Sequence, residues 1–385
     1  MQFKDVLGQE AAIEQLKVSY EHERTAHAQI FVGPEGAGGL ALALAYSQYL
    51  LCEKNETGIA DACGQCNACK KVQKNIHPDL HFSYPNIDSK SVSSDHIKEW
   101  RKMLEEKGPY INMNDWLFYL GANNQRGNIN KRECVDIVRK FSFTRVEGRF
   151  KILLLWMPEY LDKEGNRLLK LIEEPEPNTV FLLVAERAEL ILNTILSRCQ
   201  LLKLPALQDE QIATALAQEG IPAQSAQEIA YLSEGNYRKA KQLAHGQDQG
   251  EQQLGRAFAG WLRACYQGRG PMVYWVEQFV TGKHPKEGKK GNKTGRKEQL
   301  LFLEYGLFFL RELSLLQAGF PTNGLRLSVE DQKAAQGLAK LLSLPAIDEL
   351  QQLFNDHLYF IERNAHPKVL FLDLSIKIHR IFKPL

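Results

Sequence analysis

Residues 28–51 decide the fold class of this chain of 385 residues; their sequence is AQIFVGPEGAGGLALALAYSQYLL. The first five residues are an apolar run typical of a buried strand, the glycine-rich middle is typical of a tight turn, and the remainder is typical of a helix. Two further apolar runs, FKILLLWM (150–157) and TVFLLVA (179–185), alternate with helical patterns. Strands that alternate with helices predict a parallel sheet with crossover helices, and therefore an α/β domain.

The glycine-rich turn, residues 33–40, has the spacing of a phosphate-binding loop without its reactive side chains. Its glycines are Gly33, Gly36, Gly38 and Gly39. A phosphate loop has the pattern G-x-x-x-x-G-K-[ST], in which the Lys contacts the phosphates and the hydroxyl binds Mg²⁺. Here Gly39 takes the place of the Lys and Leu40 that of the Ser or Thr. We predict that this glycine loop (33–40) is a packing turn, with ATP not bound, or bound only weakly through backbone amides.

Composition places the chain among ordinary globular proteins, and its length favours two or three domains. Hydrophobic residues make up 44% and charged residues 24%, and the net charge is +2. No apolar stretch reaches the roughly 18 residues that a membrane span needs. The first residues, MQFKDVLGQE, lack the apolar core of a signal peptide. We therefore expect a cytoplasmic protein with no membrane span.

Residues 283–297, KHPKEGKKGNKTGRK, contain seven Lys or Arg and one Glu, a net charge of +6. This basic run favours a solvated loop between helices, because Gly, Lys, Pro and Asn dominate it. The alternative is sequence-independent contact with the phosphates of DNA. We prefer the loop because no aromatic residue is interleaved to stack on bases.

Four of the seven cysteines form the pattern C-x10-C-x2-C-x2-C: Cys52, Cys63, Cys66 and Cys69. In a cytoplasmic chain such a cluster favours metal binding over disulfides. Thiolates bind Zn²⁺ tetrahedrally, and short spacings let neighbouring thiolates share one ion. An iron–sulfur cluster fits the spacing poorly, and four free thiols are the other alternative. We predict one structural Zn²⁺ per chain, at a closed site, because the four cysteines complete the coordination.

Six stretches, taken together and in order, resemble the delta-prime family of clamp-loader subunits of bacterial DNA polymerase III, which are members of the AAA+ group. They are DVLGQE (5–10), HAQIFVGPEGAGG (27–39), HPDL (77–80) after the four cysteines, LLKLIEEP (168–175), ILSRC (195–199) and SEGNYRKA (233–240). Beyond residue 248 the chain resembles the family only as an all-helical region of suitable size.

The resemblance implies three domains. Residues 1–205 are expected to form an α/β AAA+ domain of the P-loop type, with a parallel sheet, a degenerate phosphate loop and an inserted zinc module at about 52–69. Residues 206–248 are expected to form a small three-helix lid domain, and residues 249–385 an all-helical C-terminal collar or oligomerisation domain. Residues 84–130 look longer than the family needs, and the sequence assigns them no role; local packing is the preferred reading of their tryptophans.

The resemblance also implies that the ATP machinery is incomplete. Active members have a Mg²⁺-binding Asp at the end of a strand, but this chain has Trp156, Met157 and Pro158 there. Glu159 is the only carboxylate nearby. Ala185 stands where active members have a polar residue that senses the γ-phosphate. Phosphoryl transfer depends on positioning and electrostatics, so the loss of the Lys, the hydroxyl and the Asp removes most of both.

Two arginines match functional positions of the family. Arg198, in ILSRC, matches the arginine that reaches into the ATP site of a neighbouring subunit, where its planar guanidinium stabilises the transferring phosphoryl group. The alternative is a surface arginine paired with an acid. Arg238, in SEGNYRKA, matches a sensor arginine that is aimed at phosphate. Because the glycine loop lacks its Lys, we prefer a solvated helix arginine at a domain junction.

The combined prediction is a stator-like, non-hydrolysing delta-prime-type subunit of the complex that loads the sliding clamp onto primed DNA. Its expected partners are the gamma/tau motor and delta subunits and, through the complex, the sliding clamp and DNA. Catalysis by the chain alone is not expected, although the complex belongs to a DNA-directed DNA polymerase. One alternative is an ATP-hydrolysing motor-type subunit, which Gly39 and Leu40 disfavour. Another is a free-standing zinc-dependent nucleic-acid-binding module, which the net charge of +2 disfavours.

Overall fold

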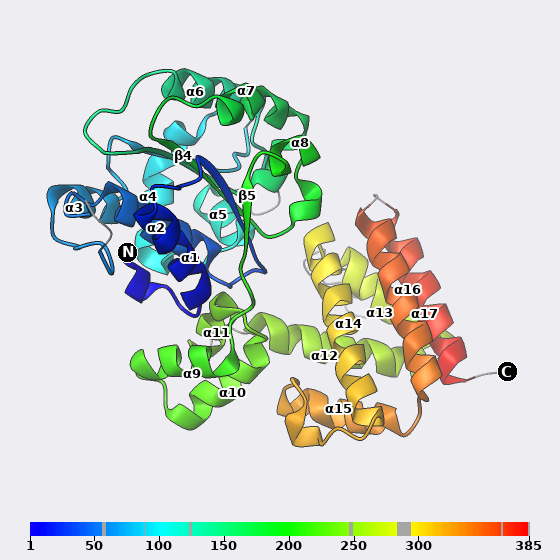
Figure 1. Ribbon diagram of the computed structural model, residues 1–385. Coiled ribbons are helices and arrows are strands. Elements are labelled where there is room, and N and C mark those ends of the chain that lie inside the picture. Colours follow the sequence, from blue (N-terminus) through cyan, green and yellow to red (C-terminus); the bar gives the residue numbers. More distant parts are fainter. Residues whose placement is uncertain are drawn as a thin grey trace. The chain divides into compact units, whose positions relative to one another are not determined.

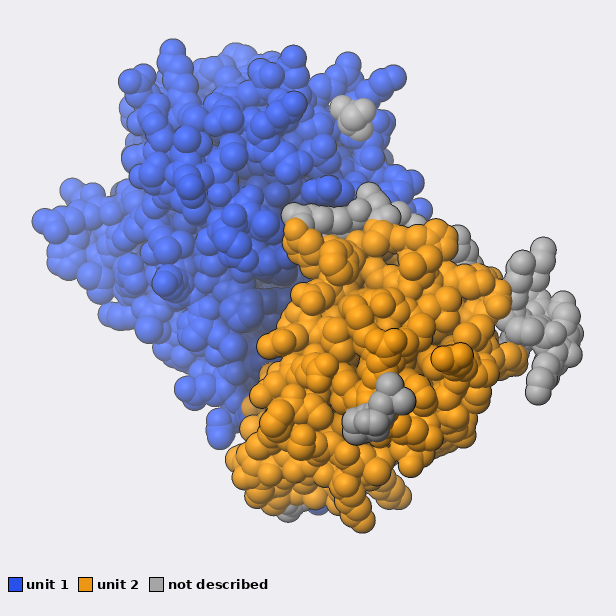
Figure 2. All heavy atoms as spheres, turned by 90° about the vertical axis from the view of Figure 1, so that its right-hand side faces the viewer, with its two compact units in different colours: residues 1–244 blue, residues 245–385 orange. Residues whose placement is uncertain are grey.

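The computed structural model divides the chain into two compact units, which Figure 2 shows in different colours. Unit 1 comprises Met1–Ala244 and unit 2 comprises His245–Leu385. The residues that the structure describes are 1–55, 59–88, 90–122, 125–245, 249–282, 294–362 and 365–383. Most of the basic run 283–297 lies outside them, so neither interpretation of that run is tested. No helix within the described ranges is long and apolar enough to cross a membrane.

A five-stranded parallel sheet forms the centre of unit 1 (Figure 1). Its strands are β1 (Ala28–Val32), β2 (Leu80–Ser83), β3 (Lys151–Trp156), β4 (Thr179–Ala185) and β5 (Gln200–Lys203). The strand order is β2-β3-β4-β1-β5, and all neighbouring pairs are parallel. The predicted α/β fold with a parallel sheet is therefore confirmed, and the apolar runs at 28–32 and 179–185 are strands β1 and β4.

Helices cover both faces of the sheet, because alternate residues along a buried strand point to opposite sides. In β3, Ile152 and Leu154 belong to the apolar core that contains α2, whereas Leu153 and Leu155 belong to the core that contains α6. The helices of this region are α1 (Glu10–Glu21), α2 (Gly39–Leu51), α3 (Asn67–Gln73), α4 (Ile97–Lys107), α5 (Met113–Tyr119), α6 (Lys131–Phe141), α7 (Leu169–Glu173) and α8 (Asn193–Leu196). Short 3-10 helices occupy Phe3–Asp5, Ser93–His96, Pro158–Leu168 and Ala188–Leu190.

Residues 84–130, the inserted segment, contain α4 and α5 and contribute to the main core. Trp100 and Trp116 are completely buried, with ring centroids 5.4 Å apart. Tyr84 stacks on Trp100 at 4.3 Å. The two tryptophans are therefore packing residues, which agrees with the reading from the sequence. Their burial fixes the inserted segment against the face of the sheet that contains α2.

Three short helices follow β5 within unit 1: α9 (Asp209–Gln218), α10 (Ala223–Ser233) and α11 (Tyr237–Ala244). They enclose a small apolar core of their own, made of Leu207, Ile212, Leu216, Ala226, Ala230, Tyr237 and Ala240. We call residues 209–244 the three-helix segment. It belongs to the same compact unit as the sheet, so its status as a separate lid domain stays a proposal.

Unit 2 contains only helices among its described residues. They are α12 (Gln249–Gln267), α13 (Arg269–Thr281), α14 (Arg296–Gln317), a short 3-10 helix (Thr322–Gly324), α15 (Val329–Ala339), α16 (Leu344–Glu362) and α17 (Pro367–Phe382). Its core is made of leucines and a cluster of aromatic rings: Phe258 lies 5.7 Å from Phe302, and Trp261 lies 5.8 Å from Phe354, between ring centroids. Such a core stabilises unit 2 without any contribution from a sheet.

Candidate functional site

The glycine loop connects β1 to α2, and its glycines are needed for close packing. Gly36 and Gly38 have φ angles of 78° and 94°, the left-handed region that glycine adopts without a steric penalty. A side chain at position 36 would collide with Asn236 of the three-helix segment. At position 38 a Cβ atom would lie 3.1 Å from the ring of Tyr110 in the inserted segment. The loop conformation thus suits contact with two other parts of the chain.

A cavity of about 30 Å³ lies beside the glycine loop. Its lining includes the loop, Tyr110, Trp156, Met157, Ala185 and Glu186. That volume is far below the roughly 300 Å³ at which small-molecule sites begin. The end of β3, where a Mg²⁺-binding Asp would be needed for ATP hydrolysis, is occupied by Trp156 and Met157, which are 2% and 4% exposed. The cavity therefore has space for water and presents no Mg²⁺ ligand at the end of β3.

Carboxylates surround this cavity. Glu35 and Glu186 line it, and neither the Lys nor the hydroxyl of a phosphate loop is present. Burial raises the pKa of Glu186 to about 7, and the negative charges of Glu35 and Glu159 add to the effect. Glu159 itself accepts hydrogen bonds from the backbone N–H groups of Glu186 and Arg187, at 2.6 and 2.8 Å. Glu159 therefore binds the backbone after β4, and the side chains that line the cavity include two carboxylates and no Lys or Arg that could contact a phosphate.

We expect Glu186→Gln to stabilise the protein at alkaline pH. Native Glu186 keeps its proton up to about pH 7, whereas an unfolded chain loses it near 4.5, so wild-type stability falls as pH rises between these values. Glutamine stays neutral and removes this loss. The midpoint of thermal unfolding should exceed that of wild type by about 2–4 °C at pH 8, with a smaller difference at pH 5. An exposed control, Glu14→Gln, should show no such pH dependence; equal midpoints for wild type and Glu186→Gln at pH 8 would contradict the expectation.

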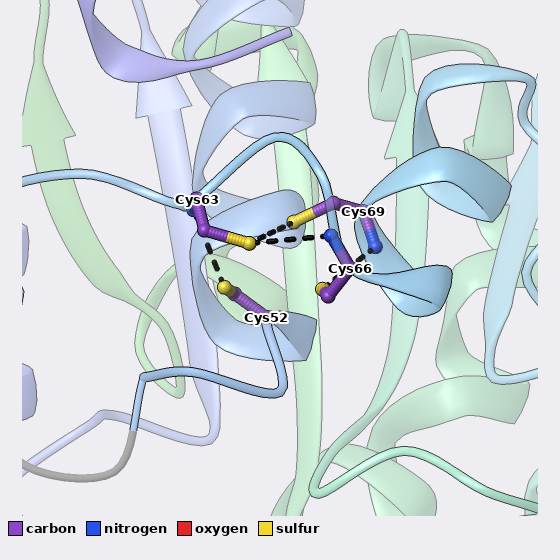
Figure 3. A group of neighbouring side chains, drawn as sticks. All are labelled: Cys52, Cys63, Cys66 and Cys69. Atoms are coloured by element: carbon purple, nitrogen blue, oxygen red, sulfur yellow. Dashed lines mark hydrogen bonds between the residues drawn. The ribbon is translucent and has the colours of Figure 1, made fainter.

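The four cysteines converge on one point (Figure 3). Cys52 follows α2, Cys66 caps α3 and Cys69 lies within α3. The four sulfur atoms lie within 4.8 Å of one another, and those of Cys63 and Cys69 are 3.9 Å apart. A tetrahedral zinc with Zn–S bonds of roughly 2.3 Å has S···S edges of roughly 3.8 Å, so the spacing fits a shared metal ion.

Backbone N–H groups point at the sulfur atoms of Cys52, Cys63 and Cys66, and the two that are aimed at Cys63 lower the pKa of that thiol to about 6, whereas burial raises the pKa of Cys52 and Cys69. Cys66 donates to the sulfur of Cys63 at 3.3 Å, Cys69 donates to that of Cys66 at 3.4 Å, and Cys63 donates to that of Cys52 at 3.4 Å. The four residues are free thiols rather than disulfides. They can therefore hold a metal ion, as the sequence predicted.

The first residues of the chain are hydrogen-bonded to residues 59–66, the segment before α3 that we call the cysteine loop. The backbone N–H groups of Phe3 and Lys4 donate to the carboxylate of Asp61 at 3.0 and 3.1 Å. Gln2 donates to the carbonyl of Ala62, next to Cys63. The conformation of residues 2–5 therefore depends on the conformation of the cysteine loop.

Arg198 follows α8 and is paired with an acid of the LLKLIEEP stretch. Its Nε donates to Oε1 of Glu173 at 2.6 Å, and its Nη1 donates to the carbonyl of Thr194 at 2.7 Å. The side chain is 32% exposed. The structure thus brings together two stretches that the sequence analysis had singled out separately, and the guanidinium lies at the surface of unit 1.

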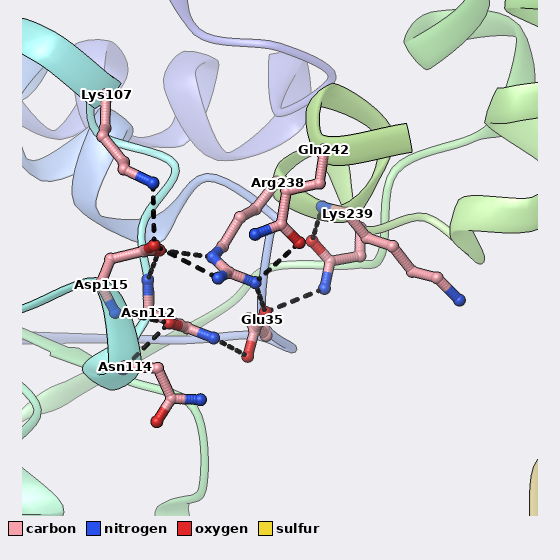
Figure 4. A network of polar contacts seen from close by, with 9 residues as sticks. Glu35, Lys107, Asn112, Asn114, Asp115, Arg238, Lys239 and Gln242 are labelled. Atoms are coloured by element: carbon pink, nitrogen blue, oxygen red, sulfur yellow. Dashed lines mark hydrogen bonds and ion pairs between the residues drawn. The ribbon is translucent and has the colours of Figure 1, made fainter. Parts of the chain in front are cut away.

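Arg238, at the start of α11, is not the solvated arginine that the sequence favoured. Its side chain is only 15% exposed and forms ion pairs with Asp115 of the inserted segment and Glu35 of the glycine loop (Figure 4). The preferred sequence interpretation was wrong because it considered only phosphate as a partner for Arg238, whereas the structure supplies carboxylates, one of them 123 residues away along the chain. Tyr110 was not predicted as a site residue, since nothing local in the sequence distinguishes it from other aromatic residues.

Comparisons with known proteins show which family the chain belongs to. A family model described as "DNA polymerase III, delta subunit" matches residues 8–208. The delta-prime subunit of DNA polymerase III from Bacillus subtilis is 26% identical over 231 residues, which cover 60% of this chain and 57% of that protein. The delta-prime subunit from Pseudomonas aeruginosa is 32% identical over 232 residues, which cover 59% and 58%. The matched region thus spans less than two thirds of either relative.

Among solved structures, a gamma subunit-related protein of DNA polymerase III from Thermotoga maritima is similar over 96% of this chain and 100% of that chain, with 14% identity and a TM-score of 0.38. The family model covers more than half of the chain and includes the sheet, the glycine loop, the four cysteines and Arg198. The chain therefore belongs to the DNA polymerase III delta-subunit family, in its group of delta-prime clamp-loader subunits.

Proposed function

We propose that the chain is a non-hydrolysing, stator-like subunit of the complex that loads the sliding clamp onto primed DNA. The observation that supports this proposal is the small volume and the lining of the cavity beside the glycine loop. It measures about 30 Å³ and is lined by Gly39, Leu40, Trp156 and Met157 where phosphate- and Mg²⁺-binding groups would be needed. Phosphoryl transfer depends on those groups almost entirely. The delta-prime relatives support the assignment to the clamp loader.

The partners in this proposal are the gamma/tau motor and delta subunits and, through them, the sliding clamp and DNA. Residues 206–248 serve as a lid and residues 249–385 as a collar through which subunits assemble. The location is the cytoplasm, where bacterial DNA is replicated. The four clustered cysteines bind one structural Zn²⁺, because their geometry matches a closed tetrahedral site.

Arg198 completes the proposal as a group that acts in a neighbouring subunit. It lies at the surface, is permanently charged, and is held by Glu173, a residue that is itself 45% exposed. An approaching phosphate can compete with one exposed carboxylate for a guanidinium at little cost, since exposed ion pairs contribute about 0–1 kcal/mol. Arg198 can therefore leave Glu173 when the ATP of a neighbour is in place.

Reconstitution tests the proposal directly. The purified chain, mixed with gamma/tau-type and delta-type subunits of the same bacterium, should co-purify with them in a stoichiometric complex that loads clamps. The chain alone should show no ATPase activity above background, whereas the motor subunit should. Failure to assemble would overturn the clamp-loader assignment, and a motor-like ATPase rate of the isolated chain would favour the motor-type alternative.

We expect that restoring the phosphate loop will not restore turnover. Gly39→Lys with Leu40→Thr returns the two reactive side chains, but Trp156 and Met157 still occupy the end of β3, so Mg²⁺ lacks its carboxylate. Leu40 is also 4% exposed, so the change places a hydroxyl in the core. Steady-state ATPase of the double variant should match wild type, after circular dichroism has shown that it folds. Turnover in the double variant would show that the missing Asp does not matter.

A further inference from the structure

Asp115 is a buried carboxylate that the inserted segment presents to the three-helix segment. It lies in the first turn of α5, whose cap, Asn112, accepts from the backbone N–H of Asp115 at 3.1 Å. In return, Asp115 accepts from the backbone N–H of Asn112 at 3.2 Å. Its side chain is 8% exposed. These contacts fix the carboxylate before any partner approaches.

Arg238 meets this carboxylate with two nitrogen atoms. Its Nε donates to Oδ2 of Asp115, and its Nη2 donates to Oδ1 at 3.3 Å, the two-bond geometry in which guanidinium–carboxylate pairs are strongest. Burial opposes ionisation of Asp115, but the hydrogen bonds and charge of Arg238 outweigh it and leave the pKa of the carboxyl below its ordinary value. Both groups are therefore charged at neutral pH.

Glu35, in the glycine loop, is the second acceptor and joins three parts of the chain. It accepts from Nη1 of Arg238 at 3.3 Å, from the amide of Asn236 at 3.2 Å and from the amide of Asn112 at 3.1 Å. Figure 4 shows Glu35 and Asp115 on either side of the Arg238 guanidinium. The glycine loop thus binds the three-helix segment through a carboxylate of its own.

Tyr110 adds an apolar contact at the same place. Its ring lies against Gly38 and packs edge-on against Tyr237 of α11, with centroids 4.8 Å apart. Its hydroxyl accepts from the backbone N–H of Leu7 at 2.9 Å. The inserted segment, which the sequence left without a role, therefore contacts both the glycine loop and the three-helix segment.

We propose that Asp115 and Glu35 form an internal anion clamp that holds Arg238, and with it the three-helix segment, on the sheet of unit 1 without any nucleotide. The buried carboxylate of Asp115 and the partly buried carboxylate of Glu35 bind this arginine in place of a phosphate. The clamp is a property of the isolated chain and does not depend on whether Arg198 acts in a neighbour. Removing Asp115 leaves Arg238, whose side chain is only 15% exposed, with Glu35 as its one remaining carboxylate partner among the described residues, and loss of a partner from a buried ion pair is strongly destabilising.

The test is hydrogen exchange of the full-length chain, followed by mass spectrometry. Asp115→Asn should raise the opening of α9–α11 on the order of 10²-fold, while the amides of β3 and β4 keep their protection. The matched control is Glu330→Gln, which breaks the ion pair between Arg256 and Glu330, both 68% exposed. This control should change exchange less than about threefold.

The double variant Asp115→Asn/Arg238→Gln distinguishes a clamp from general damage. If the two residues act as a pair, its effect should be close to that of either single variant rather than to the product of both. If the effects of the two single variants on hydrogen exchange multiply in the double variant, the proposal is wrong. Unchanged exchange of α9–α11 in Asp115→Asn would also overturn it. Wild-type protein with millimolar MgATP should show no added protection of α9–α11. Added protection there would also overturn it, because a nucleotide would then be the partner of Arg238.

Discussion

Arg198→Ala is expected to remove most ATP hydrolysis at the one site of the assembled complex that faces this chain. A guanidinium supplied by a neighbouring subunit contributes on the order of 10³–10⁵ in rate where it acts. In the proposed complex only one of several ATP sites would face this subunit, so total ATPase of the complex should fall by a fraction. Clamp loading, which needs the sites to act together, should fall further than that fraction. Steady-state ATPase and clamp loading by the reconstituted complex measure both effects.

Three further variants make this experiment specific. Arg198→Lys should not restore activity, because an ammonium group lacks the planar two-donor geometry. Glu173→Gln removes the acid that holds Arg198 and should leave clamp loading intact. Arg167→Ala removes another exposed arginine, whose partner is Glu164, and serves as the matched control. Wild-type ATPase and loading by Arg198→Ala, at confirmed stoichiometric assembly, would show that Arg198 is an ordinary surface residue.

Loss of the metal is expected to unfold the cysteine loop while unit 2 stays folded. Structural zinc contributes roughly 10–16 kcal/mol to folding in small zinc domains, and the loop around Cys63 has little core of its own. Cys66→Ala, or a strong chelator, should expose residues 59–73 to proteolysis and exchange. Residues 2–5 should loosen with them, because Asp61 and Ala62 accept their hydrogen bonds. Exchange of α12–α17 should be unchanged.

Elemental analysis decides which metal is involved. Protein purified without added metal should contain about one zinc per chain. Cys134→Ala removes a buried thiol outside the cluster and should keep the zinc. Iron with visible absorbance would replace the zinc assignment, and protein without metal, resistant to chelator, would refute the site.

The sequence by itself determined the three central strands of the sheet, β3, β4 and β1, and the absence of the side chains that ATP hydrolysis needs, whereas β2 was not predicted. The runs AQIFV and TVFLLVA became β1 and β4 with the predicted bounds, because an apolar run bounded by turns is buried most readily as a central strand. The absence of a Lys at position 39 and of an Asp at the end of β3 is a matter of residue identity and needs no structure. The cysteine cluster followed from spacing, since short loops bring neighbouring thiolates together.

Only the tertiary structure decided how the charges are paired. Arg198 pairs with Glu173, 25 residues away, and Arg238 pairs with Asp115, 123 residues away. The attraction between two charges depends on their separation in space and on burial, neither of which follows from distance along the chain. The inserted segment has a pattern of ordinary helices, and its role emerges only where the packing of Trp100 and Trp116 places Asp115 beside α11. Local patterns therefore specify the elements, whereas the contacts between elements specify which charges meet.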